Sequence, residues 1–336
     1  MDWTRSYEST WRVFRVNEKT WADGAEIRNV DSAKISRTAD GSLLETGSLV
    51  VTGDFETGYY RIVMTADQDG ELTRVDVGTL YFQASGGETN FGRTAYDVDG
   101  SSVLYPAYTT AVIIGEYAPA GADGAQYAAS LLRGAINAPV EVHGGFTLND
   151  HVVHELGAAV IEAVWAVLDA GGFVIQIDGK GIVHILPKPT EPSLTINNSS
   201  IGRLSNGIDF SADKSDIPNR YIVIDGNNVT IAVNDDPASE VSTVRRGFFV
   251  DVVDTSPTPV NGKTMAEYAH DRLKAMSIMR DERKYTREYA PDVYLYSIVR
   301  SSISGLQGDL RVLSQSIRCS NGISVSEKAA REIALW

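Results

Sequence analysis

Tyr127–Val140 reads YAASLLRGAINAPV, His154–Gly172 reads HELGAAVIEAVWAVLDAGG, and Phe173–Pro189 reads FVIQIDGKGIVHILPKP. Apolar residues recur at helical spacing in the first two segments and alternate in the third. The stretch therefore predicts helix, helix and a tight strand–turn–strand. We expect a small α/β unit over residues 126–189, placed between two β-rich segments.

The two helices have identifiable starts and ends. The first is expected to have Asp123 as its N-cap and to bury one face made of Ala128, Leu131, Leu132 and Ala135. The second is expected from about Asn149 to Ala170, with Gly171-Gly172 as its stop because glycine accepts the left-handed geometry of helix ends. Asp178–Gly181 is the predicted turn of the hairpin that follows.

The segments on either side predict strands. Residues 11–117 hold short alternating runs separated by Gly and Asp, which is typical of a barrel or sandwich. Asp67–Gly70 predicts a hairpin turn, and Gly86-Gly87 predicts another one strand later. From Leu194 strands return, interrupted by a helix expected over Thr264–Arg287.

Together these patterns predict an α+β fold in which two β-rich segments, each typical of a barrel or sandwich, flank an inserted helix–helix–hairpin unit. The expected domains are residues 1–117, 118–190 and 191–336, the last with an internal helix near 263–287 and a short C-terminal tail. That tail, SEKAAREIALW, is expected to be helical and to dock a partner through Ile333, Leu335 and Trp336.

Composition excludes several classes of function. The 336 residues are 43% hydrophobic, which is enough for two or three cores. The formal net charge of −14 argues against a general nucleic-acid or anionic-membrane surface. Cys319 is the sole cysteine, and we expect it to be a small buried residue of a C-terminal strand. With no signal-like start and no run of membrane-spanning length, the sequence predicts a soluble component.

Candidate chemistry is sparse. His151, His154 and Glu155 would share one helical face, a geometry that zinc accepts, but a solvated helix start is the favoured interpretation. Asp67–Gly70 and Asp97–Gly100 resemble fragments of calcium loops, and turns are favoured for both. The sequence has neither a phosphate-binding glycine loop nor a G-x-S-x-G elbow. We therefore expect no catalytic, cofactor-binding or metal-binding residues.

Two features predict interfaces. Positive charge accumulates between Arg272 and Arg287 in an otherwise acidic chain, which favours either docking to an acidic partner or a solvated, internally paired helix face. Aromatic residues accumulate at the N-terminus, where core and interface roles both stay open. The predicted interface residues are Trp3, Trp11, Arg280, Arg283, Lys284, Arg287 and Trp336.

The order of these parts resembles the baseplate hub family of phage tails, which includes late control proteins and the tail-tip hubs of long non-contractile tails. Four groups of residues carry the resemblance besides the helix–helix–hairpin unit. They are the opening strands of Trp11–Val51, the strands and turn of Arg74–Leu104, the strand of Pro218–Gly226, and the helix start at Thr264–Ala269.

The resemblance implies two small, tail-tube-like β-barrel domains of related type on either side of the helix–helix–hairpin unit. It also implies a non-enzymatic virion protein without cofactors, assembled in the host bacterial cytoplasm. Three copies would form a pseudo-sixfold ring that adapts the sixfold tail tube to the threefold tip. Its partners would be the tail tube or distal tail protein above, a spike, fibre or receptor-binding apparatus below, and the tape measure protein. DNA would be a partner only in transit, and no membrane would be.

Three alternatives stay open. A distal tail protein would form a hexameric ring. A host-glycan-binding module would be a β-rich domain for host attachment. A metal-dependent hydrolase would use His151, His154 and Glu155.

Overall fold

The computed structural model describes residues 1–3, 5–90, 93–113, 117–149, 151–197, 204–255, 257 and 264–336. It is mostly antiparallel sheet with a few helices, an α+β structure. Contacts divide the chain into two compact units. Unit 1 is Met1–Ile208 with Lys284–Ala329, and unit 2 is Asp209–Arg283 with Ala330–Trp336. The three-domain division at residues 117/118 and 190/191 stays a prediction.

The first seven strands of unit 1 form one antiparallel array in the order β3-β4-β7-β6-β5-β1-β2. They are β1 (Glu8–Val16), β2 (Asp23–Ile27), β3 (Val30–Thr38), β4 (Glu45–Thr52), β5 (Gly58–Gln68), β6 (Glu71–Asn90) and β7 (Arg93–Ser101). As predicted, a two-residue turn joins β5 to β6: Asp69 and Gly70 both have positive φ, and Gln68 pairs with Glu71.

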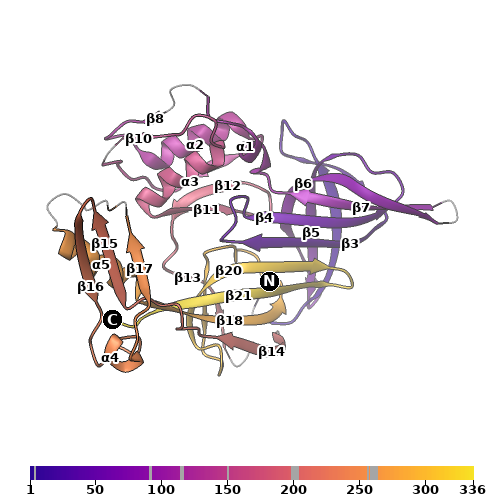
Figure 1. The fold of residues 1–336 in the computed structure, drawn as a ribbon. Coiled ribbons are helices and arrows are strands. Elements are labelled where there is room, and N and C mark those ends of the chain that lie inside the picture. The colour runs from indigo at the N-terminus through magenta and orange to yellow at the C-terminus, as the bar shows by residue number, and fades with distance from the viewer. Residues whose placement is uncertain are drawn as a thin grey trace. The chain divides into compact units, whose positions relative to one another are not determined.

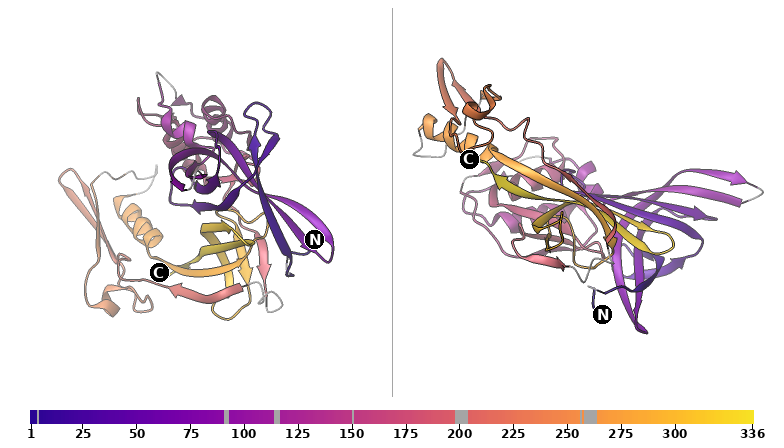
Figure 2. Two further views of the ribbon diagram at one scale, coloured as in Figure 1. Left: turned by 90° about the vertical axis from the view of Figure 1, so that its right-hand side faces the viewer. Right: turned by 90° about the horizontal axis from the view of Figure 1, so that it is seen from below.

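Two predicted turns are instead strand. Gly86-Gly87 lies inside β6 beside a bulge, and Asp97–Gly100 lies inside β7. A Cβ on Gly87 would lie 2.7 Å from the Ala95 carbonyl oxygen, and one on Gly100 2.5 Å from the Phe82 ring. These glycines therefore allow close approach within the sheet and do not reverse the chain. Beyond Phe82, the described part of β6 pairs only with β7, and the two strands extend as an arm (Figures 1 and 2).

The α/β unit follows the predicted order. Its elements are α1 (Tyr105–Thr109), β8 (Tyr117–Ala118), α2 (Gly124–Ala135), β9 (Val140–Val142), β10 (Val152–Val153), α3 (Val160–Gly171), β11 (Phe173–Ile177) and β12 (Val183–Pro187). Helices α2 and α3 lie side by side against the three-stranded sheet β11-β12-β9 (Figure 1). Asp123 caps α2 as predicted, since its Oδ1 accepts hydrogen bonds from the amides of Ala125 (3.0 Å) and Gln126 (3.2 Å).

The second helix is shorter than predicted. It begins at Val160, whereas the sequence predicts a start near Asn149. The short strand β10 pairs with β8, and Gly157, at a φ of +87°, lies in a turn, so the chain just before Val160 is not helical. Glu162 accepts a hydrogen bond from the Ala159 amide and closes the helix start there. Gly172, at φ +68°, ends the helix as predicted.

The C-terminal strands of unit 1 extend the first array, because β20 pairs with β3. The remaining strands of this sheet are β13 (Pro192–Ile196), β14 (Leu204–Ser211), β18 (Ile278–Glu288), β19 (Ile298–Ser301), β20 (Gly308–Cys319) and β21 (Ile323–Ala334). The described pairings form an open path from β14 to β2, and none of them closes a barrel. Cys319 is buried in β20 as expected, and burial raises the pKa of its thiol to about 12.

A buried polar ladder crosses five neighbouring strands of this sheet. It consists of one residue each from β18, β21, β20, β3 and β4: Arg287, Glu327, Gln315, Arg37 and Glu45. Arg287 binds both Glu327 oxygens (2.9 and 2.6 Å), and Arg37 binds Glu45 (2.6 Å). Gln315 joins the two pairs by donating to Glu327 (2.7 Å) and accepting from Arg37 (3.2 Å). Every charge of the ladder is therefore paired away from water.

Unit 2 is built around a small sheet in the order β16-β15-β17. Its strands are β15 (Arg220–Asp225), β16 (Asn228–Val233) and β17 (Asp251–Asp254), and its helices are α4 (Thr243–Arg246) and α5 (Met265–Met276). The buried Asn219 ties its loops together by donating to the carbonyls of Val241 and Phe248 and accepting from the amide of Val250.

The internal helix of this region ends earlier than predicted. A capping box of Thr264 and Glu267 starts α5, as the Thr264–Ala269 pattern suggests. The helix expected near 263–287 stops at Met276, and Ile278–Glu288 is strand β18. The C-terminal tail is also not helical. Strand β21 runs to Ala334, and Ile333, Leu335 and Trp336 pack into the cores of unit 2 itself.

Candidate interaction surfaces

One face of the small sheet in unit 2 is apolar and uncovered. Ile222 of β15 pairs directly with Ile231 of β16 and with Val253 of β17, so the three side chains share a face. By the same registers, that face holds Arg220, Ile222, Ile224, Val229, Ile231, Val233, Asp251 and Val253, which we call the outer face.

The two faces of this sheet differ in burial. Tyr221 and Val223 point to the other side, where Tyr268 and Leu273 of α5 cover them. On the outer face, Val229 is 60% exposed, Ile231 54% and Val253 53%. A contiguous group of aliphatic side chains in water is unfavourable at about 25 cal/mol per Å² of apolar area. Such a patch is a candidate interaction surface.

An ion pair lies at one end of the outer face. Arg220 donates two hydrogen bonds to the Asp251 carboxylate, at 2.7 and 2.6 Å. This contact raises the pKa of Arg220 and lowers the pKa of Asp251. The guanidinium also lies 3.8 Å from the centre of the Phe249 ring. The charges of the outer face therefore cancel within the face.

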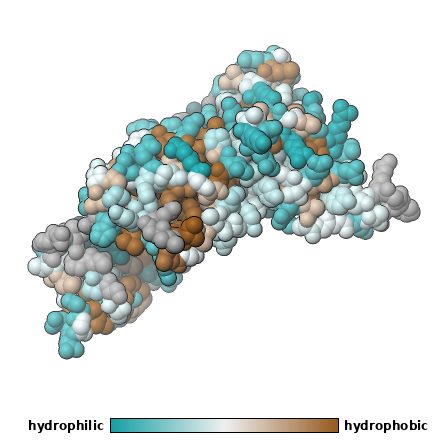
Figure 3. Space-filling model, turned by 90° about the horizontal axis from the view of Figure 1, so that it is seen from above, coloured by the Kyte–Doolittle hydropathy of each residue, from teal (hydrophilic) through white to brown (hydrophobic). Residues whose placement is uncertain are grey.

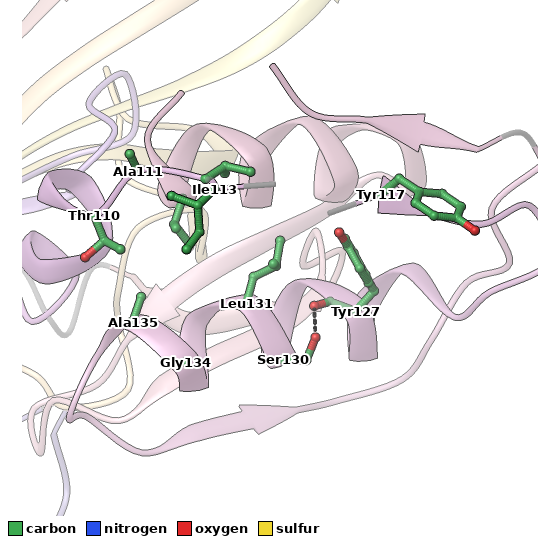
Figure 4. Close-up of a pocket in the computed structure, with 11 residues that line it drawn as sticks. Thr110, Ala111, Ile113, Tyr117, Tyr127, Ser130, Leu131, Gly134 and Ala135 are labelled. Atoms are coloured by element: carbon green, nitrogen blue, oxygen red, sulfur yellow. Dashed lines mark hydrogen bonds between the residues drawn. The ribbon is translucent and has the colours of Figure 1, made fainter. Parts of the chain in front are cut away.

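A second surface is a groove in the α/β unit, with a volume of about 490 Å³. In Figure 4, Leu131 and Tyr127 point from α2 into the groove, Ile113 lies on the opposite side, and Tyr117 stands at one end. Ser130 on the same helix donates to the Tyr127 carbonyl (2.7 Å). Figure 3 looks onto this side of the chain and shows hydrophobic residues gathered among hydrophilic ones.

The α/β unit also exposes large apolar side chains. Tyr117 of β8 pairs with Val153 of β10, and these side chains are 56% and 71% exposed. Ile113 is 74% exposed. With Leu156, also exposed, they put four large apolar side chains in water on the α/β unit.

The predicted aromatic interface residues are all partly buried. Trp3 packs edge-on against Tyr7, and the Trp11 indole donates to the Ser320 carbonyl (2.7 Å). Trp336 packs against His270 and the α5 core. Each indole is held by its own unit, and an interface role for these residues stays a prediction.

The predicted basic segment is divided between α5 and β18. Arg287 is 3% exposed and belongs to the polar ladder. Arg283 pairs with Asp281, which also accepts from Arg331. Arg280 and Lys284 are the exposed members of the predicted set. Their docking role stays a prediction.

The residues of the alternative metal site do not meet. Among the described residues, His151, His154 and Glu155 form no ligand group. All three lie before the start of α3. The buried His154 ring stacks on the Tyr127 ring, and its Nε2 lies 3.2 Å from the Tyr127 hydroxyl. A different group does meet: Glu141, His143 and His184, from β9, the residue after it and β12. The sequence reasoning missed this group.

The comparisons identify the fold. The 43 kDa tail protein of prophage MuSo2 from Shewanella oneidensis matches with a TM-score of 0.64 and 13% identity, over 96% of this chain and 98% of its own. A tail protein from Neisseria meningitidis MC58 matches with a TM-score of 0.67 and 13% identity, over 98% of both chains. The chain therefore has the fold of phage tail proteins.

A third solved structure is also similar to this chain. A chain of the Francisella PdpA–VgrG complex matches 97% of this chain with a TM-score of 0.58 and 7% identity, and this chain spans 53% of its length. No protein-family model and no curated protein matches the sequence. No helix in the described residues is long and apolar enough to cross a bilayer.

Proposed function

We propose that this protein is a structural virion component, the hub of a bacteriophage baseplate or tail tip. Three copies form a ring that adapts the sixfold tail tube to the threefold tip and lets DNA pass. The observation that carries the proposal is the match to a prophage tail protein over almost the full length of both chains. The fit to a chain of the PdpA–VgrG complex supports a role in association with other proteins.

The outer face supports association with a second copy of the chain. Each chain carries a formal net charge of −14, so two copies repel each other over most of their surface. The outer face is an exception, because Arg220 and Asp251 neutralise each other and the other six residues are aliphatic. Contact there buries apolar area without bringing like charges together.

The proposed ring also gives roles to the domains of the chain, to its lumen and to its partners. In the ring, the two β-rich parts of each chain act as related barrel-type domains. The lumen is a conduit for the tape measure protein and DNA, and an acidic lumen does not retain DNA because DNA is a polyanion. The tail tube or distal tail protein binds above, and a spike, fibre or receptor-binding apparatus binds below. The chain acts without catalysis, and other proteins supply any enzymatic step.

A first experiment counts copies. Native mass spectrometry of the purified full chain should give three copies of 36.4 kDa, or show trimers when tail tube protein is added. Six copies would instead support a distal tail protein. Binding of isolated protein to host wall glycans, without any ring, would favour a host-attachment module.

A second experiment locates the protein. A gold label on the C-terminus, imaged by negative stain on intact tails, should appear at the tail tip. Label at the opposite end of the tail would contradict the hub proposal, whatever the mass in solution.

A further inference from the structure

Two neighbouring strands of the α/β unit place three metal-binding side chains together. Strands β9 and β12 are parallel, and Glu141 pairs directly with His184. Directly paired residues project from the same face of a sheet. The amide of His143 donates to the Ile185 carbonyl (2.8 Å), which fixes the backbone just after β9. Rigid strand backbone therefore positions all three donors.

The donor atoms form a triangle of the size that a metal ion needs. His143 Nε2 lies 2.9 Å from His184 Nδ1, and Glu141 Oε2 lies 3.5 Å from His184 Nδ1 and 3.7 Å from His143 Nε2. Zinc bonds to nitrogen and oxygen are about 2.0–2.1 Å long and tetrahedral, which puts donors about 3.3 Å apart. The three distances between donor atoms in this protein, 2.9, 3.5 and 3.7 Å, lie on either side of that separation.

A fourth side chain orients one of the ligands. Asp178 Oδ2 lies 3.3 Å from His184 Nε2, and Asp178 Oδ1 accepts the Ile182 amide (2.8 Å) in the β11–β12 turn. With Asp178 beside Nε2, the other ring nitrogen of His184, Nδ1, faces Glu141 and His143. A carboxylate behind a histidine in this way is the usual outer partner of a metal-bound imidazole. It is a second observation, independent of the triangle.

Exposure and donor chemistry decide the class of ion. His184 is 22% exposed and His143 53%, so an ion can enter from solvent and keep one position for water. Two imidazoles with one carboxylate suit zinc and its neighbours in the first transition row. Calcium and magnesium prefer a shell of oxygen atoms.

We propose that Glu141, His143 and His184 bind one divalent transition-metal ion of the zinc class, with Asp178 as the positioning residue for His184. The sequence alone led to the expectation of no metal site, and this inference departs from it. The ion links the two parallel strands at the surface of the α/β unit. Its open position accepts water or a donor from another molecule.

The test is metal binding by the full chain after chelator treatment. Isothermal titration with Zn²⁺ should give one ion per chain, and Co²⁺ should give the visible absorption of a four-coordinate site. His143→Ala removes an exposed ligand and should lower the affinity at least 10-fold. Asp178→Asn leaves all three ligands in place and should lower it about 10- to 100-fold.

A matched control is His151→Ala, which removes another exposed histidine of the same unit and should bind as the wild type does. Circular dichroism establishes that each variant is folded. Because His143 is half-exposed, its variant is expected to fold even if a His184 variant does not. Unchanged binding in His143→Ala, or an equal loss in His151→Ala, would overturn the proposal.

Discussion

At the scale of single residues, the polar ladder fixes how the sheet is assembled. Arg287 and Glu327 meet across 40 positions of sequence, and Arg37 and Gln315 across 278. Removing one partner of such a buried pair leaves an uncompensated charge, which costs about 3–5 kcal/mol. A one-residue slip of β20 against β3 would have the same effect. We infer that the ladder specifies the strand register in addition to any net stability.

Two half-buried tyrosines, Tyr294 and Tyr296, predict the response to alkali. Burial raises the pKa of Tyr294 to about 12 and the pKa of Tyr296 to about 12, against about 10 in an unfolded chain. Between pH 10 and 12 the unfolded chain loses these protons while the folded chain keeps them. The stabilising contribution is therefore complete below about pH 10 and is lost as pH rises toward 12.

Thermal unfolding followed by circular dichroism from pH 8 to 12 measures this effect. The Tyr294→Phe/Tyr296→Phe variant removes both titrating groups and should show a shallower fall of the melting temperature. Tyr108→Phe, at an exposed tyrosine, is the control and should follow the wild type. An identical pH dependence in all three proteins would show that these two side chains are not responsible.

Sequence reasoning at this scale succeeded where the partner is close along the chain. The Asp123 cap could be predicted because the amides that donate to it are two and three residues away. Arg37 and Glu327 look like ordinary surface charges in the sequence, because only the folded sheet brings their partners to them. His143 and His184 are 41 positions apart, and likewise only the fold brings them together.

At the scale of elements, glycines set how tightly α2 and α3 pack. The Phe146 ring lies against both helices, since a Cβ on either Gly124 or Gly171 would come within 2.4 Å of it. Phe146 also packs on Phe173 of β11, with ring centres 4.9 Å apart. A single aromatic ring thus contacts two helices and a strand.

Gly171→Ala should lower the free energy of unfolding by about 1–3 kcal/mol, because the new methyl group overlaps the Phe146 ring. The matched variant is Gly134→Ala in α2, where a Cβ meets nothing within 4 Å. That change should raise stability by about 0.4–1 kcal/mol. Urea unfolding of both variants measures the difference, and equal effects would contradict the packing argument.

Element types were more predictable than element ends. The periodicity of α2 and the glycine stop of α3 are local signals, and both appear in the structure. The start of α3 was missed because apolar residues before it recur at helical spacing. In the structure, the turn at Gly157 and the β8–β10 pairing keep those residues out of the helix. Strand β18 was missed because two of its buried positions hold charged residues, Asp281 and Arg287. The sequence there lacks the alternation of apolar and polar residues that predicts a strand.

At the scale of the whole molecule, we expect self-association to depend on the outer face. The double variant Ile231→Lys/Val253→Lys places two like charges on it. Both side chains are more than half exposed, so the chain should fold normally while self-association weakens. Native mass spectrometry should show the trimer replaced by monomer. Val244→Lys, at an exposed site on α4, is the control, and equal assembly by all three proteins would exclude the outer face.

The class of fold could be predicted at this scale, because the order of β-rich, α/β and β-rich segments is a property of the sequence. The outer face could have been suspected as well. Residues 220–233 read RYIVIDGNNVTIAV, and their apolar positions fall on both faces of a strand pair although a single helix covers only one. The joining of β20 to β3 was not predictable, since those strands lie far apart in the chain.

The division of unit 2 into two pieces of chain governs when it can fold during synthesis. Asp209–Arg283 leaves the ribosome before Lys284–Ala329 and only then Ala330–Trp336. The late segment supplies Ile333, Leu335 and Trp336 to cores whose other members were made earlier. At about 5–20 residues per second, the early part waits some seconds for them. Completion of these cores therefore follows the synthesis of all of Lys284–Ala329.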